Sequence, residues 1–264
     1  MSSFHGSFPV RVSVTTLNVW GNKHWPARGI PLVQTLLTLR SDVYLFQEVT
    51  PSIISYLDSN LATYSRVEGP RGWTTESNIY WNSQLFDLVD SGRGDLALDS
   101  YPDRSLFWAR LRIKGTDMTI FVSTAHFPWA GDDREVATGI NARIPAAMKV
   151  CEHLRRLVPP GEPTIFGGDV NDDFHPVRVL NEEGGLMDVF ESLDLPPPIT
   201  HPVRPSDPQE EMRPNRTLDW ILCSLPAQCR VVAAFAKKVR GGGTSCPVSD
   251  HLPVVAIFEI GSAP

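Results

Sequence analysis

The segment Thr164-Ile165-Phe166-Gly167-Gly168-Asp169-Val170-Asn171 decides the fold predicted for this chain. Its first three residues predict a short buried strand, and the two glycines lead the chain into the polar residues Asp169 and Asn171. Upstream, residues 144–158 have the apolar spacing of a helix, which Pro159-Pro160-Gly161 closes. A helix followed by a buried strand that ends in polar residues is typical of α/β proteins.

The same arrangement occurs near the N-terminus. Residues 10–18 alternate between apolar and polar side chains, which predicts a half-buried strand that ends at Asn18. A helical pattern and a second apolar run follow, and that run ends in Gln47-Glu48. The helical pattern consists of Ile30, Val33, Leu36, Leu37 and Leu39. Further elements are predicted as a helix over 51–61 and strands near 77–82, 85–90, 105–113, 117–126, 218–222, 231–235 and 253–260.

No internal repeat and no linker divides the chain, so we predict one catalytic domain over residues 1–264, with residues 1–9 as a flexible N-terminal tail. Residues 196–214 contain seven prolines, which predicts a long loop of the kind that shapes a binding site. The triple glycine at 241–243 predicts a flexible break.

Length and composition indicate a globular protein with a large core. The chain has 264 residues, of which 42% are apolar, and these include 7 Trp and 12 Phe. The net charge of −6 argues against nucleic-acid binding through a broad positive field, although a cation among carboxylates can neutralise a phosphate locally. The four cysteines lack metal-ligand spacing and are predicted to be reduced thiols. Because we find no signal peptide and no long apolar run, we expect a soluble, intracellular protein. We also expect a monomer.

Four segments place polar residues at predicted strand ends in a fixed order. They are Thr16-Leu17-Asn18, Phe46-Gln47-Glu48, Gly168-Asp169-Val170-Asn171 and Ser249-Asp250-His251. This order resembles that of the endonuclease/exonuclease/phosphatase superfamily, over about residues 10 to 260. The resemblance implies an α/β fold, a four-layer sandwich of two packed mixed β-sheets flanked by helices. It also implies an enzyme that hydrolyses phosphate esters with a divalent metal.

Three of these residues have the chemistry of a metal site. Glu48 and Asp250 supply carboxylates and Asn18 supplies a neutral oxygen, which are the hard ligands that Mg²⁺ prefers. Because Mg²⁺ keeps several waters, positions would remain for water and for a substrate phosphate oxygen. We therefore predict Mg²⁺, or Mn²⁺, as the cofactor.

The remaining polar residues are candidates for catalysis. His251 can take a proton from water near neutral pH if another group fixes its tautomer, and the resemblance assigns that role to Asp219. By the same resemblance, Asp169 positions the attacking water or protonates the leaving group. Asn171 then donates to a phosphoryl oxygen, and His126 contacts phosphate. Asp169 and Asn171 are two residues apart and would point the same way on an extended chain.

Five further residues are candidates for substrate binding. Arg143 and Arg216 could contact phosphate oxygens in a bidentate manner, and Trp25, Trp73 and Trp129 could stack on a base or another flat group. The motif set is similar to that of tyrosyl-DNA phosphodiesterases and of phosphatase-like members. We therefore predict a phosphodiesterase, with a nucleic-acid end or single strand among its candidate substrates. The alternatives are a phosphomonoesterase acting on sugar, inositol or lipid phosphates, and a catalytically silent binding scaffold.

Overall fold

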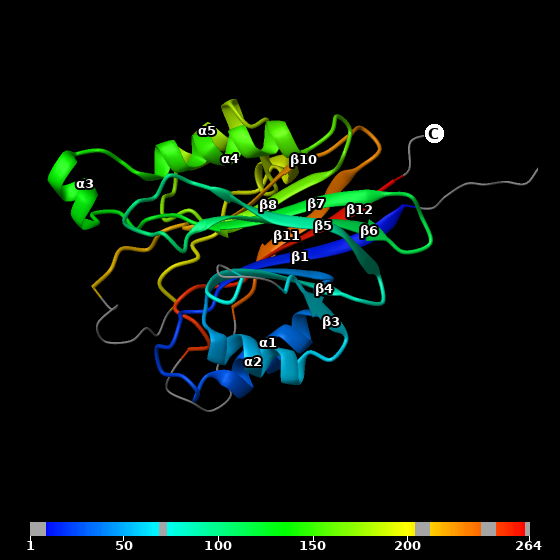
Figure 1. Cartoon of the computed structure of the whole chain (residues 1–264), viewed down its shortest axis with the longest axis horizontal. Coiled ribbons are helices and arrows are strands. Elements are labelled where there is room, and N and C mark those ends of the chain that lie inside the picture. The colour runs from blue at the N-terminus through cyan, green and yellow to red at the C-terminus, as the bar shows by residue number, and fades with distance from the viewer. Residues whose placement is uncertain (1–8, 69–72, 204–211, 239–246, 262–264) are drawn as a thin grey trace, which may run out of the picture.

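A computed structural model describes residues 9–68, 73–203, 212–238 and 247–261. Within these residues, the strands form two mixed six-stranded sheets that pack face to face (Figure 1). The first sheet has the order β11 (Arg230–Ala236), β12 (Val254–Ile260), β1 (Val10–Asn18), β2 (Val43–Val49), β4 (Glu76–Asn82), β3 (Tyr64–Arg66). The second has the order β5 (Phe86–Asp95), β6 (Ser105–Ile113), β7 (Thr119–His126), β8 (Thr164–Asp169), β10 (Asp219–Ser224), β9 (Met187–Asp188).

Helices cover the outer face of each sheet. Two of them, α1 (Gly29–Leu39) and α2 (Pro51–Asn60), pack on the first sheet. On the second sheet lie α4 (Arg143–Leu157) and α5 (His175–Glu182), whereas α3 (Asp133–Thr138) lies to one side (Figure 1). A short 3₁₀ helix, η1 (Glu191–Leu193), follows β9. This arrangement confirms the predicted four-layer α/β sandwich. Among the described residues, no helix is both long enough and apolar enough to cross a membrane.

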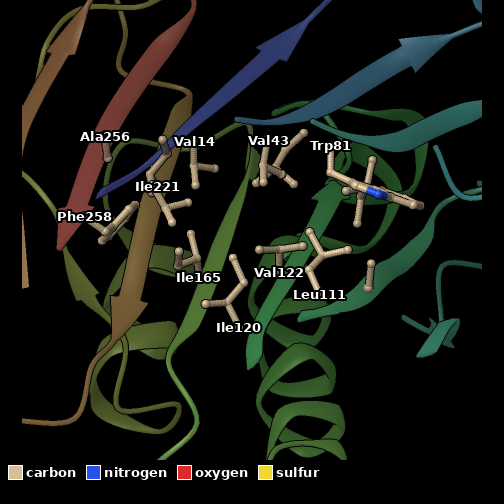
Figure 2. Packing of buried hydrophobic residues seen from close by; sticks show 14 of the residues in the cluster. Val14, Val43, Trp81, Leu111, Ile120, Val122, Ile165, Ile221, Ala256 and Phe258 are labelled. Carbon is tan, nitrogen blue, oxygen red and sulfur yellow. The ribbon is translucent and has the colours of Figure 1, made fainter. Parts of the chain in front are cut away.

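The apolar core between the sheets follows from the alternation of side chains along each strand. Val12 and Val14 of β1 face the second sheet, where they meet Ile165 of β8 and Ile221 of β10 (Figure 2). The intervening residues point to the helices, as Phe166 of β8 does. The central strands therefore have buried residues on both faces, which explains why they read as nearly continuous apolar runs.

The structure corrects the predicted buried face of the first helix. Leu32, Val33 and Leu36 are buried, whereas Ile30 and Leu37 are exposed. The helical spacing allowed either a buried face with Ile30 and Leu37 or one with Leu32 and Leu36. Packing on the sheet buries the face that contains Leu32.

Two helices were absent from the sequence prediction, namely α3 and α5. Each begins with a recognisable signal, since Asp132 caps α3 and a proline occupies the first turn of α5. The cysteines Cys151, Cys223 and Cys229 are free and buried. Residues 1–8, the triple glycine at 241–243, Cys246 and residues 204–211 of the proline-rich loop lie outside the described residues.

Packing requires the glycine pair Gly167-Gly168, which precedes the last residue of β8. A Cβ atom on Gly168 would overlap the backbone carbonyl oxygen of Ala125 on the neighbouring strand β7. A Cβ atom on Gly167 would lie 2.7 Å from Cδ1 of Leu45 on the facing sheet. The pair therefore allows β8 to approach both a neighbouring strand and the other sheet at the point where Asp169 follows.

We expect Gly168→Ala to lower the free energy of unfolding by about 3 kcal/mol or more, because a backbone carbonyl cannot move aside. Gly167→Ala should cost about 1 kcal/mol, since the end of a leucine side chain can adjust. Urea denaturation followed by circular dichroism measures both values. Equal losses for the two variants would contradict this explanation.

Candidate active site

The candidate active site lies at one end of the sandwich, where the inward-facing positions of the strands pass from apolar to polar residues. Asn18 and Asp169 are the last residues of β1 and β8, His126 is the last residue of β7, and Asp219 is the first of β10. In β8 the inward positions are Ile165, Gly167 and then Asp169. The alternation that builds the core therefore also directs these polar side chains into the space between the sheets.

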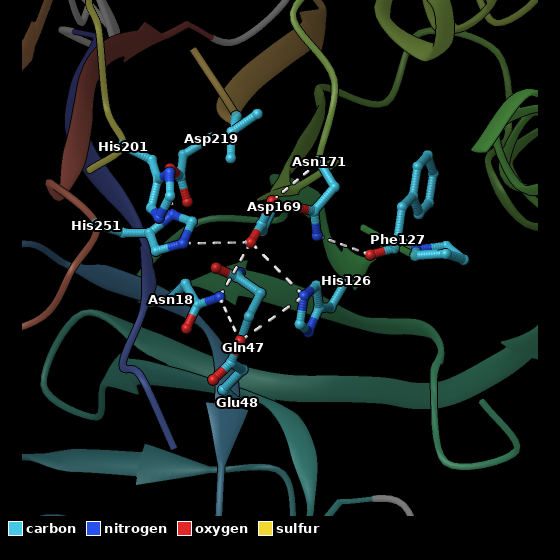
Figure 3. A network of polar contacts seen from close by, with 12 residues as sticks. Asn18, Gln47, Glu48, His126, Phe127, Asp169, Asn171, His201, Asp219 and His251 are labelled. Atoms are coloured by element: carbon cyan, nitrogen blue, oxygen red, sulfur yellow. Dashed lines mark hydrogen bonds and ion pairs between the residues drawn. The ribbon is translucent and has the colours of Figure 1, made fainter. Parts of the chain in front are cut away.

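The carboxylate of Asp169 is the centre of this cluster (Figure 3). Its Oδ2 accepts a hydrogen bond from Nδ2 of Asn18 at 3.0 Å and lies 3.6 Å from Nε2 of His126 and 3.7 Å from Nε2 of His251. Its Oδ1 accepts from the backbone N–H of Asn171 at 2.9 Å. Asp169 is 1% exposed, so these neighbours replace the water that an ionised carboxylate would otherwise bind.

His251 and Asp219 form a hydrogen-bonded pair, as the resemblance implied. Nδ1 of His251 lies 2.7 Å from Oδ2 of Asp219. In the neutral imidazole, donation from Nδ1 to Asp219 leaves the lone pair on Nε2, which faces Asp169. Burial alone would lower the pKa of His251, but the charges of Asp219, Asp169 and Asp250 outweigh burial and raise it well above its usual range. Burial raises the pKa of Asp219, and His251 opposes this effect.

Glu48 reaches the site because β2 bulges where it pairs with β4. The register shifts between Gln47 and Val49, and Glu48 adopts a left-handed backbone conformation with φ of 57°. Its Oε1 accepts from Nδ2 of Asn18 at 2.9 Å, and its side chain is 34% exposed. Gln47 is buried and donates to Thr124 of the second sheet, so it joins the sheets instead of entering the site.

Asp250 lies on the segment before β12. Oγ of the preceding Ser249 donates to the backbone carbonyl of Asn18 at 2.7 Å, which holds this segment against the end of β1. The charge of His251 and a hydrogen bond from His201 lower the pKa of Asp250, although its burial acts to raise it. Asp250 is therefore an anionic carboxylate on a segment that is anchored to the end of β1 at Asn18.

Two groups of buried side chains have donor atoms close enough to share a metal ion in the described part of the chain. One group is His201, Asp250 and His251, and the other is Asp169, Asp219 and His251. Within each group the ligand atoms lie within 4.8 Å of one another. Glu48 belongs to neither group. The chemistry of the donors of Asn18, Glu48 and Asp250, two carboxylates and one amide oxygen, is that of a hard cation which retains several waters.

Sequence analysis missed Glu76, which supports His126. Oε2 of Glu76 lies 3.1 Å from Nδ1 of His126, and Oε1 lies 3.4 Å from Nε of Arg104. Burial would raise the pKa of Glu76, but His126 and Arg104 together lower it to about 2. Glu76 is the first residue of β4, so the antiparallel pairing of β4 with the strand that ends near Glu48 was the signal that could have revealed it.

The structure contradicts two of the predicted substrate contacts. Trp73 is 4% exposed and packs against Phe107 in the core between the sheets, so neither face of its indole can stack on a ligand. Arg143 is buried and forms ion pairs with Glu135 and Asp172. Both carboxylates occupy the guanidinium group, which fixes the start of α4 and leaves no donor pair for phosphate.

Asn171 also differs from the prediction. The chain turns after Asp169, and Asn171 adopts a left-handed conformation with φ of 52°. Its Nδ2 donates to the backbone carbonyl of Phe127 at 2.9 Å. Asn171 and Asp169 therefore do not project together from an extended strand. The turn instead places the Asn171 amide beside the loop that follows β7.

Trp129 and Arg216 line a cavity of about 350 Å³ next to the cluster, with Ala130, Asn171, His201, Arg213, Pro214 and Leu218. Trp129 is 52% exposed, whereas Arg216 forms a bidentate ion pair with Asp173. Trp25 is partly buried against Tyr56. A larger cavity of about 670 Å³, under α5 and η1, contains none of the predicted site residues.

Several solved structures share this fold. TDP2 from D. rerio, in a complex with single strand DNA product, matches with a TM-score of 0.80 and 17% identity, over 94% of this chain and 99% of that one. The mannosyl-6-phosphatase Bt3783 from Bacteroides thetaiotaomicron matches with a TM-score of 0.72 and 20% identity, over 94% and 99%. No curated protein sequence matches the chain.

The endonuclease/exonuclease/phosphatase protein from Bacteroides vulgatus has a TM-score of 0.77 and 18% identity, over 95% of this chain and 99% of that one. At these identities the structural matches establish the fold. The family assignment comes from the sequence itself, because the model of the Endonuclease/Exonuclease/phosphatase family matches residues 15–251. Its match spans every polar strand end described above, from Asn18 to His251. The chain therefore belongs to the Endonuclease/Exonuclease/phosphatase family and has a phosphoesterase fold.

Proposed function

We propose that this protein is a divalent-metal-dependent hydrolase of phosphate esters and that it acts as a phosphodiesterase. The observation that supports this most directly is the convergence on Asp169 of three groups with different chemistry. They are the Asn18 amide next to Glu48, the imidazole of His126, and the His251–Asp219 pair. Binding a cation, stabilising a phosphoryl group and moving a proton require these three types of group.

Asn18, Glu48 and Asp250 would hold Mg²⁺ or Mn²⁺, which fit a set of hard oxygen donors. When bound, the ion would polarise a phosphoryl oxygen and neutralise part of its charge. The side-chain amide of Asn18 is fixed by two hydrogen bonds. Its Nδ2 donates to Glu48, and its Oδ1 accepts from the backbone N–H of Trp20.

Side chains of the protein would transfer the proton and stabilise the negative charge that develops on the phosphoryl oxygens. His251, oriented by Asp219, takes the proton of the attacking water at Nε2. Asp169 lies 3.7 Å from that nitrogen and either orients the same water or protonates the leaving oxygen. His126, fixed by Glu76 through its Nδ1, and Asn171 donate to the phosphoryl oxygens.

The cavity beside the cluster favours a substrate that extends past the phosphate. The exposed indole of Trp129 offers a stacking face, and Arg216, which is paired with Asp173, lies on the same wall. A net charge of −6 favours a short end or a single strand over a long duplex, since few phosphates can be neutralised outside the site. The similar fold of TDP2 in complex with single strand DNA product supports this substrate class.

A phosphomonoesterase is the second candidate. The mannosyl-6-phosphatase shares the fold over nearly the same length, and a flat indole above a polar site can also stack on a sugar ring. The two proposals differ in whether the substrate phosphate carries two ester-linked groups or one, so a panel of single-stranded oligonucleotides and sugar phosphates separates them.

Chelation should abolish hydrolysis of this panel, and Mg²⁺ or Mn²⁺ should restore it. Glu48→Gln should weaken the apparent metal affinity by on the order of tenfold or more, because a charged ligand becomes neutral. The melting temperature should change little, as Glu48 is partly exposed. Titration of activity with metal measures the first effect. An unchanged midpoint in the Gln variant would show that Glu48 is not a ligand.

Substitution His251→Ala should lower kcat by about 10²- to 10⁴-fold, the usual effect of removing a positioned acid or base. Asp219→Asn should also lower kcat, because it can favour the wrong imidazole tautomer. Steady-state kinetics at saturating metal provide the comparison, with His175→Gln as a control on an exposed imidazole outside the site. A folded His251→Ala enzyme within a few-fold of the wild-type kcat would end this assignment.

For a short single-stranded substrate, Trp129→Ala should raise KM by about 5- to 100-fold, which corresponds to the loss of one stacked base. The matched control is Phe174→Ala, which removes an aromatic side chain of similar exposure from the larger cavity. If both variants change KM equally, the cavity beside Asn171 is not the substrate groove.

A further inference from the structure

We propose that His201, Asp250 and His251 form a binding site for Zn²⁺ that shares Asp250 with the oxygen-rich magnesium site and that inhibits the enzyme when filled. His201 was not singled out by sequence analysis and has no role in the hydrolysis proposed above. The inhibitory part of this proposal rests on the proposed function, whereas zinc binding can be tested without it.

The donor atoms are already close to a zinc geometry. Nε2 of His201 lies 3.7 Å from Oδ2 of Asp250, and Nε2 of His251 lies 4.0 Å from Oδ1 of the same carboxylate. Bonds of about 2.0 to 2.1 Å in a tetrahedral zinc complex would place neighbouring ligand atoms about 3.3 Å apart. One ligand atom of each residue lies within 4.8 Å of those of the other two, so changes of up to about 1.5 Å in these separations would bring the three donors onto one ion, with a fourth position left for water.

The ligand types select the metal. Two imidazoles and one carboxylate are a ligand set that Zn²⁺ takes readily, whereas Mg²⁺ prefers oxygen donors and near-octahedral geometry. Nδ1 of His251 also donates to Asp219, and a hydrogen bond of this kind to a carboxylate fixes the orientation of a zinc-binding imidazole. In the neutral imidazole, this hydrogen bond leaves the lone pair of His251 on Nε2, which lies 3.7 Å from Asp169 and 4.0 Å from Asp250.

Backbone contacts hold the three residues in place. His201 exchanges two hydrogen bonds with Arg216, at 3.0 and 2.8 Å. The segment after it pairs with the ligand segment, because Val203 N–H donates to the carbonyl of Asp250 and Leu252 N–H donates to that of Thr200. The rings of His201 and His251 lie 4.6 Å apart at an angle of 41°. Little ordering would therefore be needed when an ion binds.

Occupation of this site would interfere with hydrolysis in two ways. The lone pair of His251 at Nε2 would be committed to the metal, so it could not accept a proton from water. Asp250 would be shared between the two ions, which would weaken the binding of Mg²⁺. Zinc should therefore inhibit more strongly at low Mg²⁺ than at high Mg²⁺.

The test uses Co²⁺ as a spectroscopic substitute for Zn²⁺, added to the full chain in the presence of excess Mg²⁺. Wild-type protein should show the intense visible absorption of four-coordinate Co²⁺, and Zn²⁺ should remove it by displacement. In His201→Phe, which retains an aromatic ring against His251 but no ligand atom, the apparent affinity should fall by on the order of 100-fold. His175→Gln should behave as wild type, because it removes an exposed imidazole elsewhere.

Circular dichroism checks the fold of each variant, and His201→Gln replaces His201→Phe if the latter does not fold. Inhibition by Zn²⁺, expressed relative to the rate of the same variant without zinc, should weaken in parallel with binding. Wild-type absorption in the folded His201 variant, loss of absorption in His175→Gln, or no four-coordinate spectrum in the wild type would each overturn the proposal. A chain that binds Zn²⁺ at His201 but hydrolyses no phosphate ester would instead refute the proposed function alone.

Discussion

The burial of the Asp169 carboxylate is the constraint on which the rest of the site depends. This group is 1% exposed and has no lysine or arginine partner among the contacts of its two oxygens in the described residues. Its solvation must come from the ends of other strands, through the amide of Asn18, the backbone of Asn171 and two imidazoles. An arrangement that displaced one of these donors would leave a buried charge without compensation.

This constraint also couples the two sheets. Asn18 belongs to the first sheet and Asp169 to the second, so their hydrogen bond forms only when the sheets are packed in register. Gln47 makes a second polar contact across the same interface, to Thr124. The apolar core between the sheets provides most of the stabilisation, and these polar contacts select one relative position of the sheets.

Backbone geometry at the site departs from regular strand structure where side chains must be redirected. Glu48, Glu76 and Asn171 all have positive φ angles, which non-glycine residues adopt at some energetic cost. Hydrogen bonds link Glu48 to Asn18, Glu76 to His126, and the backbone of Asn171 to Asp169. The regular packing of the sandwich supports these local distortions. The distortions direct polar side chains to positions that the regular alternation of a strand would not give them.

The sequence by itself determined the layered α/β fold and most of the central cluster. Strand patterns predicted that Asn18 and Asp169 lie at strand ends, and the family resemblance assigned His126 and Asp219 to the same site. The sequence could not identify Glu76 or His201, because their roles depend on segments that meet only after the sheets pair. For the same reason it could not distinguish the buried Trp73 from the exposed Trp129. Period and residue type are local properties, whereas burial, ion pairing and the approach of distant strands are decided by the tertiary structure.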